Sequence, residues 1–154
     1  MADCSGTWTS KIFWRRKNGH IQDPPLEDPD GEFIIDPHTG STFTGRHHEE
    51  PHTTPLFNTL CVDQRGRDRF LIKMHRLDLT VTPPEQFMYS GTGTIDPNTG
   101  EMVVTDGEVF VPGGPEPNDA GTWEASKPGG GDDDEDEKKD KKNKERPNKD
   151  AVGE

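Results

Sequence analysis

Six consecutive residues, His47-His48-Glu49-Glu50-Pro51-His52, form the densest set of possible metal ligands in the chain. Imidazoles and carboxylates bind first-row transition metals, and His48 and His52 would share one ion only if the chain between them curled. Pro51 and the nearby Pro55 predict an irregular connection without the fixed spacing of a helix. We therefore expect a solvent-exposed loop here, with no metal site and no cofactor.

No catalytic constellation is legible in the sequence. Ser90-Gly91-Thr92-Gly93 lacks the strand-to-helix context of a hydrolase nucleophile, and its glycines favour close strand packing or a β-bulge. A phosphate-binding loop is also unsupported, because these glycines precede a strand rather than a helix. We therefore predict no catalytic residue. An enzyme that uses His75 or a nearby carboxylate in acid–base catalysis is the least favoured function.

The charge of the chain limits its partners. The net charge of −12 over 154 residues disfavours nucleic acid and anionic membrane surfaces, which need clustered Lys and Arg. Local basic patches remain, and we expect their side chains on solvated strand faces and turns. One of them consists of Arg65, Arg67, Arg69, Lys73 and Arg76.

The cysteine count leaves the compartment open. Cys4 and Cys61 are the only two cysteines, which permits one disulfide but does not require it. No apolar run is long enough to span a membrane, and the N-terminus has no secretory signal in this form. The default expectation is a soluble, cytoplasmic protein with two reduced thiols, and a secreted protein is the alternative.

The C-terminal segment differs in composition from the rest. An acidic run at residues 132–137 precedes seven basic residues between positions 138 and 149, and Val152 is the only large apolar residue after Lys127. Burial there cannot offset the roughly 1–2 kcal/mol per residue that ordering a backbone costs. We predict one domain over residues 1–127 and a disordered, charged tail over residues 128–154.

One turn sequence occurs twice, as Asp36-Pro37-His38-Thr39-Gly40 and as Asp96-Pro97-Asn98-Thr99-Gly100. Asp accepts hydrogen bonds from the amides ahead of it, Pro presets φ, and Gly adopts the left-handed conformation that ends such a turn. The flanking β-patterned runs are residues 32–35 and 41–45 in the first case and residues 92–95 and 101–104 in the second. We predict a hairpin at each, and a third around residues 63–66 between arms 56–62 and 67–75.

The remaining patterns predict an all-β fold. In the arm 67–75, Phe70, Ile72 and Met74 share one face, and further strands are expected at residues 7–15, 78–82, 87–90, 108–111 and 121–126. No window carries helical periodicity with usable caps. The matching ends Gly6-Thr7-Trp8 and Gly121-Thr122-Trp123 suit edge strands that pair and close the sheet. We predict a single antiparallel up-and-down barrel of about eight strands.

Aromatic residues provide the candidate binding site. Trp8, Ser10, Ile12 and Trp14 share a parity that we expect to face the interior, and Trp123 is expected near Trp8 where the sheet closes. These side chains either form a filled core or line a ligand cup at the mouth of the barrel. The candidate ligand-binding residues are Trp8, Trp14, Phe43, Phe70, Tyr89 and Trp123.

The order of these features resembles the calycin group of up-and-down barrels, and within it the avidin and streptavidin family. The opening Gly6-Thr7-Trp8-Thr9, the segment Phe43-Thr44-Gly45-Arg46 and the late Trp123-Glu124-Ala125-Ser126 lie where that family has comparable segments. An opening Gly-x-Trp is also typical of lipocalins. The resemblance implies a barrel with a ligand site in its mouth. It does not imply biotin, because residues 10–13 lack the family's Asn that grips the ureido group.

The favoured function is therefore the binding of a small apolar or aromatic ligand in the mouth of the barrel, oriented by a few Thr, Ser or Arg side chains. The alternative is a structural or protein-interaction barrel with a filled interior, for which a homodimer is one form. A lipocalin-like enzyme comes third. Cavity volume distinguishes the first two.

Overall fold

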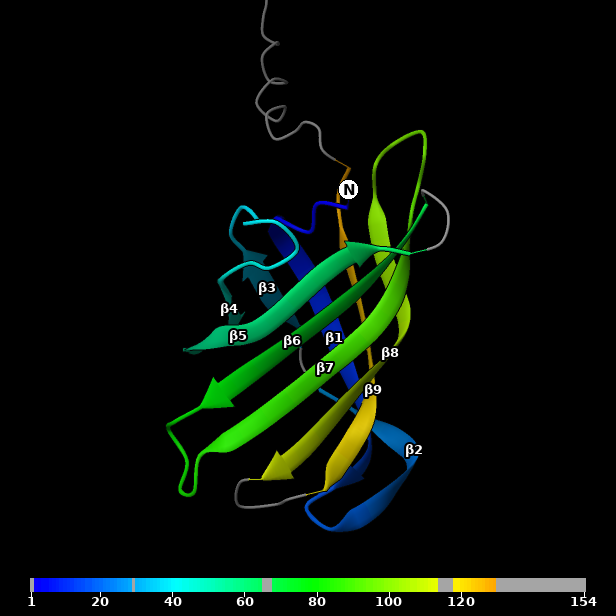
Figure 1. The fold of residues 1–154 in the computed structure, drawn as a ribbon. Coiled ribbons are helices and arrows are strands. Elements are labelled where there is room, and N and C mark those ends of the chain that lie inside the picture. Colours follow the sequence, from blue (N-terminus) through cyan, green and yellow to red (C-terminus); the bar gives the residue numbers. More distant parts are fainter. Residues whose placement is uncertain (1, 29, 65–67, 114–117, 130–154) are drawn as a thin grey trace, which may run out of the picture.

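The computed structural model describes residues 2–28, 30–64, 68–113 and 118–129, and these ranges contain nine β-strands and no helix (Figure 1). The predicted tail, residues 128–154, lies outside the described residues from position 130 onward. The described residues include no helix that could span a membrane. The strands are β1 Gly6–Lys17, β2 His20–Glu27, β3 Gly31–Ile35, β4 Gly45–Glu49, β5 His52–Asp63, β6 Arg69–Asp78, β7 Glu85–Ile95, β8 Met102–Gly113 and β9 Asp119–Lys127.

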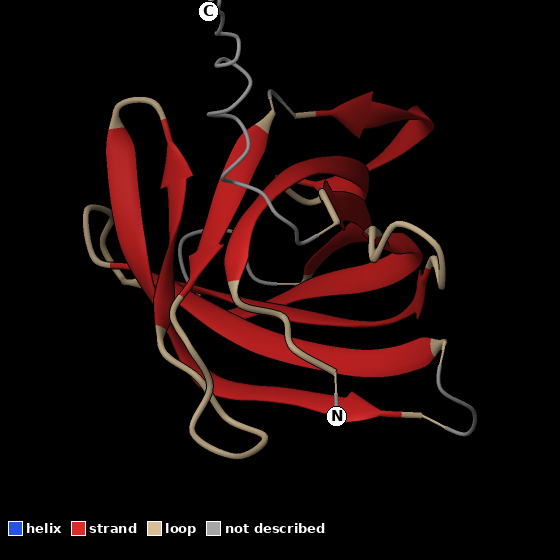
Figure 2. Cartoon of the chain, turned by 90° about the horizontal axis from the view of Figure 1, so that it is seen from above, coloured by secondary structure: helices blue, strands red, loops and turns tan. Residues whose placement is uncertain are grey.

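Eight of the strands, β1 and β3 to β9, form a closed antiparallel barrel (Figures 1 and 2). The barrel closes where β1 pairs with β9, from Thr9 opposite Ser126 to Arg16 opposite Ala120. The predicted all-β fold, its strand number and its closure through the matching ends are therefore confirmed. The register differs in one detail, because Trp123 lies opposite Ile12 rather than Trp8.

The strand β2 lies outside this ring and was not predicted. It pairs with the second half of β1 along the edge that β3 occupies in the first half. The amide of Asp28 donates to the carbonyl of Ile12 at 2.9 Å, where β2 has ended. The overlooked signal is Asn18-Gly19, a two-residue loop with φ values of 55° and 80° that is typical of a type I′ hairpin.

The predicted hairpin at the second repeated turn sequence is confirmed. Asp96 accepts hydrogen bonds from the amides of Asn98 (2.8 Å) and Thr99 (3.2 Å), and Gly100 has a φ of 80°. At the first, an antiparallel strand follows β3 as predicted, but it is β4 and shares only Gly45 with the predicted arm 41–45. The third hairpin, between β5 and β6, is also confirmed by the pairing of Asp63 with Phe70. The tip of this hairpin lies outside the described residues.

Some predicted strand boundaries are wrong. Residues 41–44 belong to the loop between β3 and β4, which folds back on β5: the carbonyl of Ser41 accepts from the amide of Cys61 at 2.8 Å. Thr59 Oγ1 bonds both the amide and the carbonyl of Phe43, which fixes that loop. Residues 79–82 form bends rather than a strand, and the predicted pairs of short strands at 87–95 and 101–111 are the single strands β7 and β8.

The predicted solvent-exposed loop at residues 47–52 is also wrong. His47 lies in β4 and is only 3% exposed, and His52 begins β5 after a tight turn at Glu50-Pro51. The proline at position 51 occupies the turn itself, so it does not interrupt either strand.

The interior is filled by aromatic side chains in successive contacts along the barrel. Trp8 lies against Phe70 where β1 begins, with 6.0 Å between ring centroids. Farther along, Phe33, Tyr89 and Trp123 meet edge to face at 5.1 to 5.9 Å. At the opposite end, Trp14 and Phe87 are 6.2 Å apart. An eight-stranded barrel is just wide enough for side chains to fill it in this way.

The central indole requires glycines on the neighbouring strands. An added Cβ on Gly107 would lie 2.7 Å from Trp123 Cδ1, and one on Gly91 would lie 3.4 Å from Trp123 Cζ2. The registers of β7–β8 and β8–β9 shift beside these two glycines. The predicted role of Ser90-Gly91-Thr92-Gly93 in close packing or a bulge is therefore confirmed.

The thiols of Cys4 and Cys61 are joined in a disulfide, with 6.5 Å between their Cα atoms. The expected pair of reduced thiols is thus wrong for this structure. The bond fastens the segment before β1 to β5 across one end of the barrel. Closing a loop of 57 residues is worth about 4 kcal/mol of stability in the chain-entropy estimate.

We expect Gly107→Ala to lower the free energy of unfolding by about 1–3 kcal/mol, because the methyl group would overlap the Trp123 indole. Urea unfolding monitored by circular dichroism measures this. Glu124→Ala, at the exposed position of β9 next to Trp123, is the matched control and should change stability by less than about 0.5 kcal/mol. Equal effects of the two substitutions would contradict this account of the packing.

Candidate functional site

The end of the barrel at which β1 finishes contains a cavity of about 180 Å³. We call it the Trp14 mouth; it is the lower end of the barrel in Figure 1. Its lining residues come from five strands of the barrel, from the segment after β2 and from the turn between β4 and β5. They are Trp14, Lys17, Asp28, His47, Glu49, Glu50, His52, Thr54, Arg76, Asp78 and Phe87.

Strand alternation carries polar side chains into this mouth. On β6 the inward positions are Phe70, Ile72 and Met74, followed by Arg76 and Asp78, so the inward face changes from apolar to charged as the strand reaches the mouth. His47 faces inward from β4, and an added Cβ on Gly31 of β3 would lie 2.8 Å from its Nε2. A glycine on the neighbouring strand thus provides the space for the imidazole.

Arg76 is the most unusual of these groups because it is 8% exposed and has no carboxylate partner. Its Nε donates to Tyr89 Oη at 3.2 Å, and its Cζ lies 3.8 Å from the centroid of the Phe87 ring. Within the described ranges, no acidic oxygen lies within 4.0 Å of its guanidinium, and its terminal amino groups have no hydrogen-bond partner. These nitrogens are not among the described atoms that are fully buried without a partner, so they face the space of the cavity and are available to a bound molecule.

Thr54 presents a second unpaired group. Its Oγ1 is buried without a hydrogen-bond partner, and the residue lines the same cavity as Arg76. Leaving a buried hydroxyl unpaired costs about 1–3 kcal/mol, which a ligand in the cavity would recover.

Trp14 forms an apolar wall of the mouth with a fixed orientation. Its Nε1 donates to Asp28 Oδ2 at 2.7 Å, and Lys17 Nζ lies 4.6 Å from the centroid of the indole ring. The hydrogen bond and the cation fix the indole, while Phe87 provides the second aromatic surface.

Burial shifts the titration of several groups around Arg76. It lowers the pKa of His47 to about 3, with the Arg76 and His48 charges adding to the effect, so His47 is neutral at physiological pH. Burial and the Asp28 charge raise the pKa of Glu49, which Arg76 partly opposes. Burial also raises the pKa of Tyr89, so its phenol keeps its proton.

The six candidate ligand-binding residues are all buried, and the structure divides them between the two ends and the middle of the barrel. Trp14 lines the mouth, and Tyr89 reaches it through its hydrogen bond to Arg76. Trp123 lies in the middle of the interior. Trp8, Phe43 and Phe70 lie at the other end, where Trp8 Nε1 donates to the carbonyl of Cys4.

The sequence-based predictions did not include the polar residues of the Trp14 mouth. Arg76 was predicted on a solvated strand face, which is wrong, and its parity with Ile72 and Met74 was the signal that places it inside. His47 was hidden by the incorrect loop prediction. No local pattern distinguishes Thr54 from the exposed Thr53 beside it.

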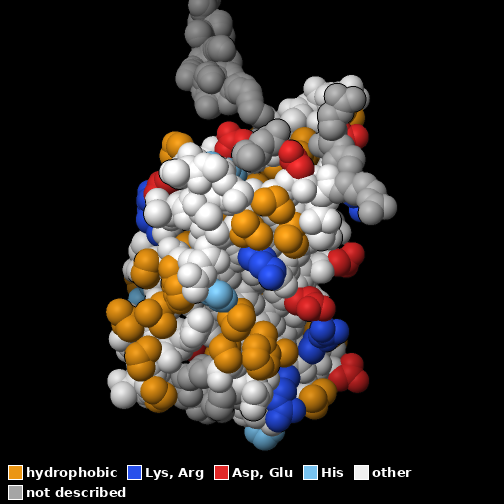
Figure 3. Space-filling model, viewed as in Figure 1, with side chains coloured by type: hydrophobic (Ala, Val, Ile, Leu, Met, Phe, Trp, Pro, Cys, Tyr) orange, Lys and Arg blue, Asp and Glu red, His pale blue; other side chains and the backbone are white. Residues whose placement is uncertain are grey.

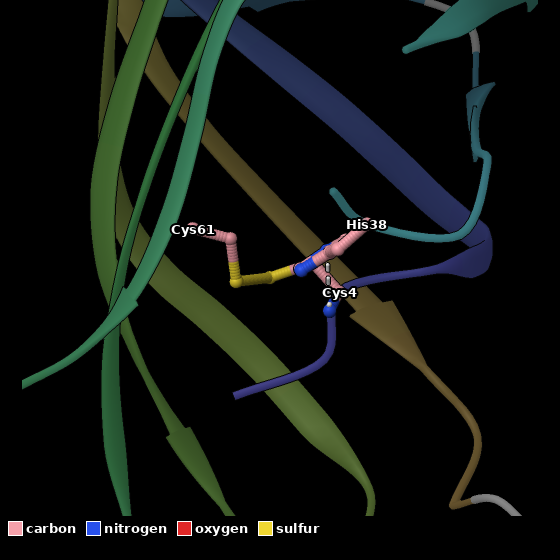
Figure 4. Close-up of side chains that lie close together, drawn as sticks. All are labelled: Cys4, His38 and Cys61. Carbon is pink, nitrogen blue, oxygen red and sulfur yellow. Dashed lines mark hydrogen bonds between the residues drawn. A yellow bond between two sulfur atoms is a disulfide. The ribbon is translucent and has the colours of Figure 1, made fainter. Parts of the chain in front are cut away.

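The other end of the barrel is closed by a different group of side chains. Cys4, His38 and Cys61 come from three separate segments, and their potential ligand atoms lie within 4.8 Å of one another (Figure 4). Within the described ranges this is the one group of three His, Cys, Asp or Glu residues close enough to share a metal ion. Here the two sulfurs are bonded to each other.

We expect acid to destabilise the fold through His47. In the unfolded state His47 has its ordinary pKa of 6.5 and is protonated below that pH, whereas in the folded state it stays neutral until about pH 3. The free energy of unfolding therefore falls as the pH decreases through this window. The expected loss from this residue between pH 7 and pH 5 is about 2 kcal/mol. Urea unfolding at both pH values should show a smaller loss for His47→Gln than for the original chain.

The matched control for this prediction is His20→Gln, since His20 is exposed on β2. It should keep the full pH dependence of the unmodified protein. Identical pH dependence of His47→Gln and the unmodified protein would show that His47 does not carry the effect.

Comparison with known proteins gives no assignment for this barrel: no family model, no curated protein and no solved structure matches the chain.

Proposed function

We propose that this protein binds a small, neutral molecule with one aromatic or apolar ring in the Trp14 mouth. The observation that carries the proposal is the buried Arg76, whose terminal donors are unpaired within the described residues and which lines a cavity of about 180 Å³. A protein cavity of roughly 150 Å³ holds benzene, so this mouth has room for a ligand with a single ring.

The polar lining favours a ligand group that both accepts and donates hydrogen bonds. Arg76 and Thr54 offer donors, whereas the carboxylates of Asp28 and Glu49 offer acceptors. An amide or a hydroxyl satisfies both sets. An anionic ligand is less suited, because four carboxylates line the mouth against two cationic side chains.

The apolar part of the ligand would lie between aromatic surfaces. Trp14 and Phe87 line the cavity, and Asp28 holds the indole in place. The rings of Phe33, Tyr89 and Trp123 occupy the middle of the barrel, so they limit how far a ligand can extend from the mouth into the interior. The ligand therefore sits in the mouth and not in a deep channel.

A ligand site at one open end of a closed barrel agrees with the calycin-like arrangement expected from the sequence. The mouth differs from the expected aromatic cup, since one side of it is lined by charged and polar groups. The disulfide supports the secreted alternative over a cytoplasmic location, because disulfides persist mainly in oxidising compartments.

Benzamide tests this proposal directly, since it combines one ring with a neutral group that accepts and donates hydrogen bonds. We expect it to bind more tightly than toluene or benzoate and to change the fluorescence of Trp14, as measured by titration of the unmodified protein and of Trp14→Phe. Arg76→Met should weaken benzamide binding about tenfold or more, because a hydrogen bond to a charged group is lost.

Thr54→Val separates binding from folding. Removing the unpaired hydroxyl should leave the ligand-free protein as stable or more stable, while benzamide binding weakens about threefold to tenfold. Arg15→Met, on the exposed face of β1, is the control for Arg76→Met and should bind normally. Unchanged affinity in folded Arg76→Met, or no benzamide binding at millimolar concentration, would refute the proposal.

A second candidate function, assembly with another copy of the chain, is favoured by the outer face of β6, β7 and β8. Met88 and Phe110 face each other across β7 and β8 and are 39% and 42% exposed. They border a groove that also contains Lys73 and Glu108, and Figure 3 shows hydrophobic side chains gathered on this side. A two-fold interface would pair the Lys73 of each copy with the Glu108 of the other.

We expect this face to produce a dimer that Phe110→Lys abolishes, because the substitution places a cation in the apolar part of the patch. Sedimentation equilibrium of both proteins measures the effect. Ile21→Lys, at an exposed apolar position on β2, is the control and should remain dimeric. A monomeric unmodified protein over the full concentration range would remove this candidate.

A further inference from the structure

Three segments converge on the closed end of the barrel, opposite the Trp14 mouth. Cys4 precedes β1, His38 belongs to the loop between β3 and β4, and Cys61 lies in β5. Figure 4 shows the His38 ring directed at Cys4 and the disulfide. Both sulfurs are fully buried, and the imidazole side chain is only 10% exposed.

The imidazole is held in the form that coordinates metals. His38 Nε2 accepts a hydrogen bond from the amide of Cys4 at 3.1 Å, so this nitrogen carries a lone pair and no proton. The ring stacks on Phe43 with 5.3 Å between centroids and 19° between planes. Its orientation toward the cysteines is therefore fixed before any ion arrives.

We propose that the reduced protein binds one zinc-class divalent cation through Cys4, Cys61 and His38, and that the disulfide is the metal-free form of the same site. Two thiolates and one imidazole are ligands typical of zinc, which is four-coordinate in most such sites. A water molecule or the carboxylate of Asp3 would complete the set; Asp3 Oδ1 lies 3.9 Å from His38 Nε2 and accepts a hydrogen bond from the amide of Ser5 at 3.0 Å.

The geometry requires only small movements. Two sulfurs at about 2.3 Å from a tetrahedral zinc ion are about 3.8 Å apart, and an imidazole nitrogen would be about 3.6 Å from each. All three potential ligand atoms already lie within 4.8 Å of one another. On binding, the ion replaces the amide of Cys4 as the partner of His38 Nε2.

The site also has an entry path. A surface cavity lined by Ala2, Asp3, Pro37, His38 and Gly40 lies beside the imidazole and opens to solvent. An ion that enters through it meets Asp3 first, because this side chain is exposed, and then the buried sulfurs. Both states of the site keep the segment before β1 attached to β5, so the end of the barrel stays closed.

The chemistry balances with a phosphine as the reductant. The phosphine transfers two electrons to the disulfide and becomes its oxide by taking oxygen from water, and the two sulfurs become thiols. The metal then displaces the two thiol protons and binds both thiolates. Hydrogen peroxide reverses the change: it takes two electrons from the two thiolates and, with two protons, becomes two water molecules. The disulfide that forms removes two of the ligands, and the ion is released.

The test uses the full chain and Co²⁺ as a spectroscopic substitute for Zn²⁺. Protein reduced with a phosphine and kept free of oxygen is titrated with Co²⁺, and the oxidised protein is titrated in parallel. We expect one Co²⁺ per reduced chain, with thiolate-to-cobalt charge-transfer absorption and the strong visible bands of tetrahedral cobalt, all displaced by Zn²⁺. The oxidised protein should show neither.

His38→Ala tests the imidazole while both thiols and the oxidised fold remain. It should weaken Co²⁺ binding at least about tenfold. Removing a residue that only hydrogen-bonds to a metal ligand already weakens binding by about that factor, and removing the ligand itself should cost at least as much. His20→Ala, on β2, is the control and should bind normally. Near-ultraviolet circular dichroism of each oxidised variant verifies the fold.

Three results would overturn the proposal. The first is the absence of charge-transfer absorption in reduced protein that keeps its fold. The second is equal affinity of His38→Ala and the unmodified chain. The third is loss of the fold on reduction that Zn²⁺ does not restore, because a metal bound to the native site must stabilise the reduced barrel.

Discussion

The pairing of β1 with β9 is the constraint on which the rest of the structure depends. It joins the two ends of the described sheet over Thr9 to Arg16 and leaves an interior only as wide as eight strands allow. A chain with 26% hydrophobic residues can fill so narrow a space, because a few large rings do most of the packing. Trp8, Trp123 and Trp14 are buried at successive levels of the barrel, and each meets a ring from another strand.

The same closure explains why chemistry is confined to the ends. Rings of the described residues occupy the middle, and glycines at positions 91 and 107 bring the neighbouring strands close around Trp123. Inward positions near the strand ends can carry polar groups at a lower cost than those in the middle. Arg76 and His47 occupy such positions, and the Tyr89 hydroxyl accepts the one hydrogen bond that the guanidinium makes to the described residues.

Much of the fold was predictable from short signals in the sequence. The repeated Asp-Pro-x-Thr-Gly turns, the alternation in β6 and the matching ends each specify local geometry, and together they define the barrel. The exact strand limits were less predictable, since residues 41–44 have strand-like composition but are bound by Thr59 into a loop over the barrel end. That contact joins positions 16 residues apart, and no local pattern encodes it.

The candidate site was less predictable than the fold, for a physical reason. The parity of Arg76 with Ile72 and Met74 points inward, but an inward position near a strand end can still lie in solvent, and the packing of Phe87 against Arg76 is what buries it. The pairing of Cys4 with Cys61 likewise depends on tertiary structure, because an even number of thiols allows either state.

The two ends of the barrel can therefore respond to different conditions. Under the proposed function, a ligand at the Trp14 mouth would satisfy Arg76 and Thr54 and so stabilise the fold. At the closed end, what can change is the oxidation state of Cys4 and Cys61. Both are buried, and His38 and Phe43 stack beside them. The rigid rings between the ends keep the two sites apart: Trp8 and Phe70 contact each other beside the disulfide end, and Trp14 and Phe87 do so at the mouth. Coupling between them would require a second arrangement of this packed interior, and a close-packed core resists such rearrangement. If both proposals hold, ligand binding at one end and redox chemistry at the other are thus expected to be independent properties of one barrel.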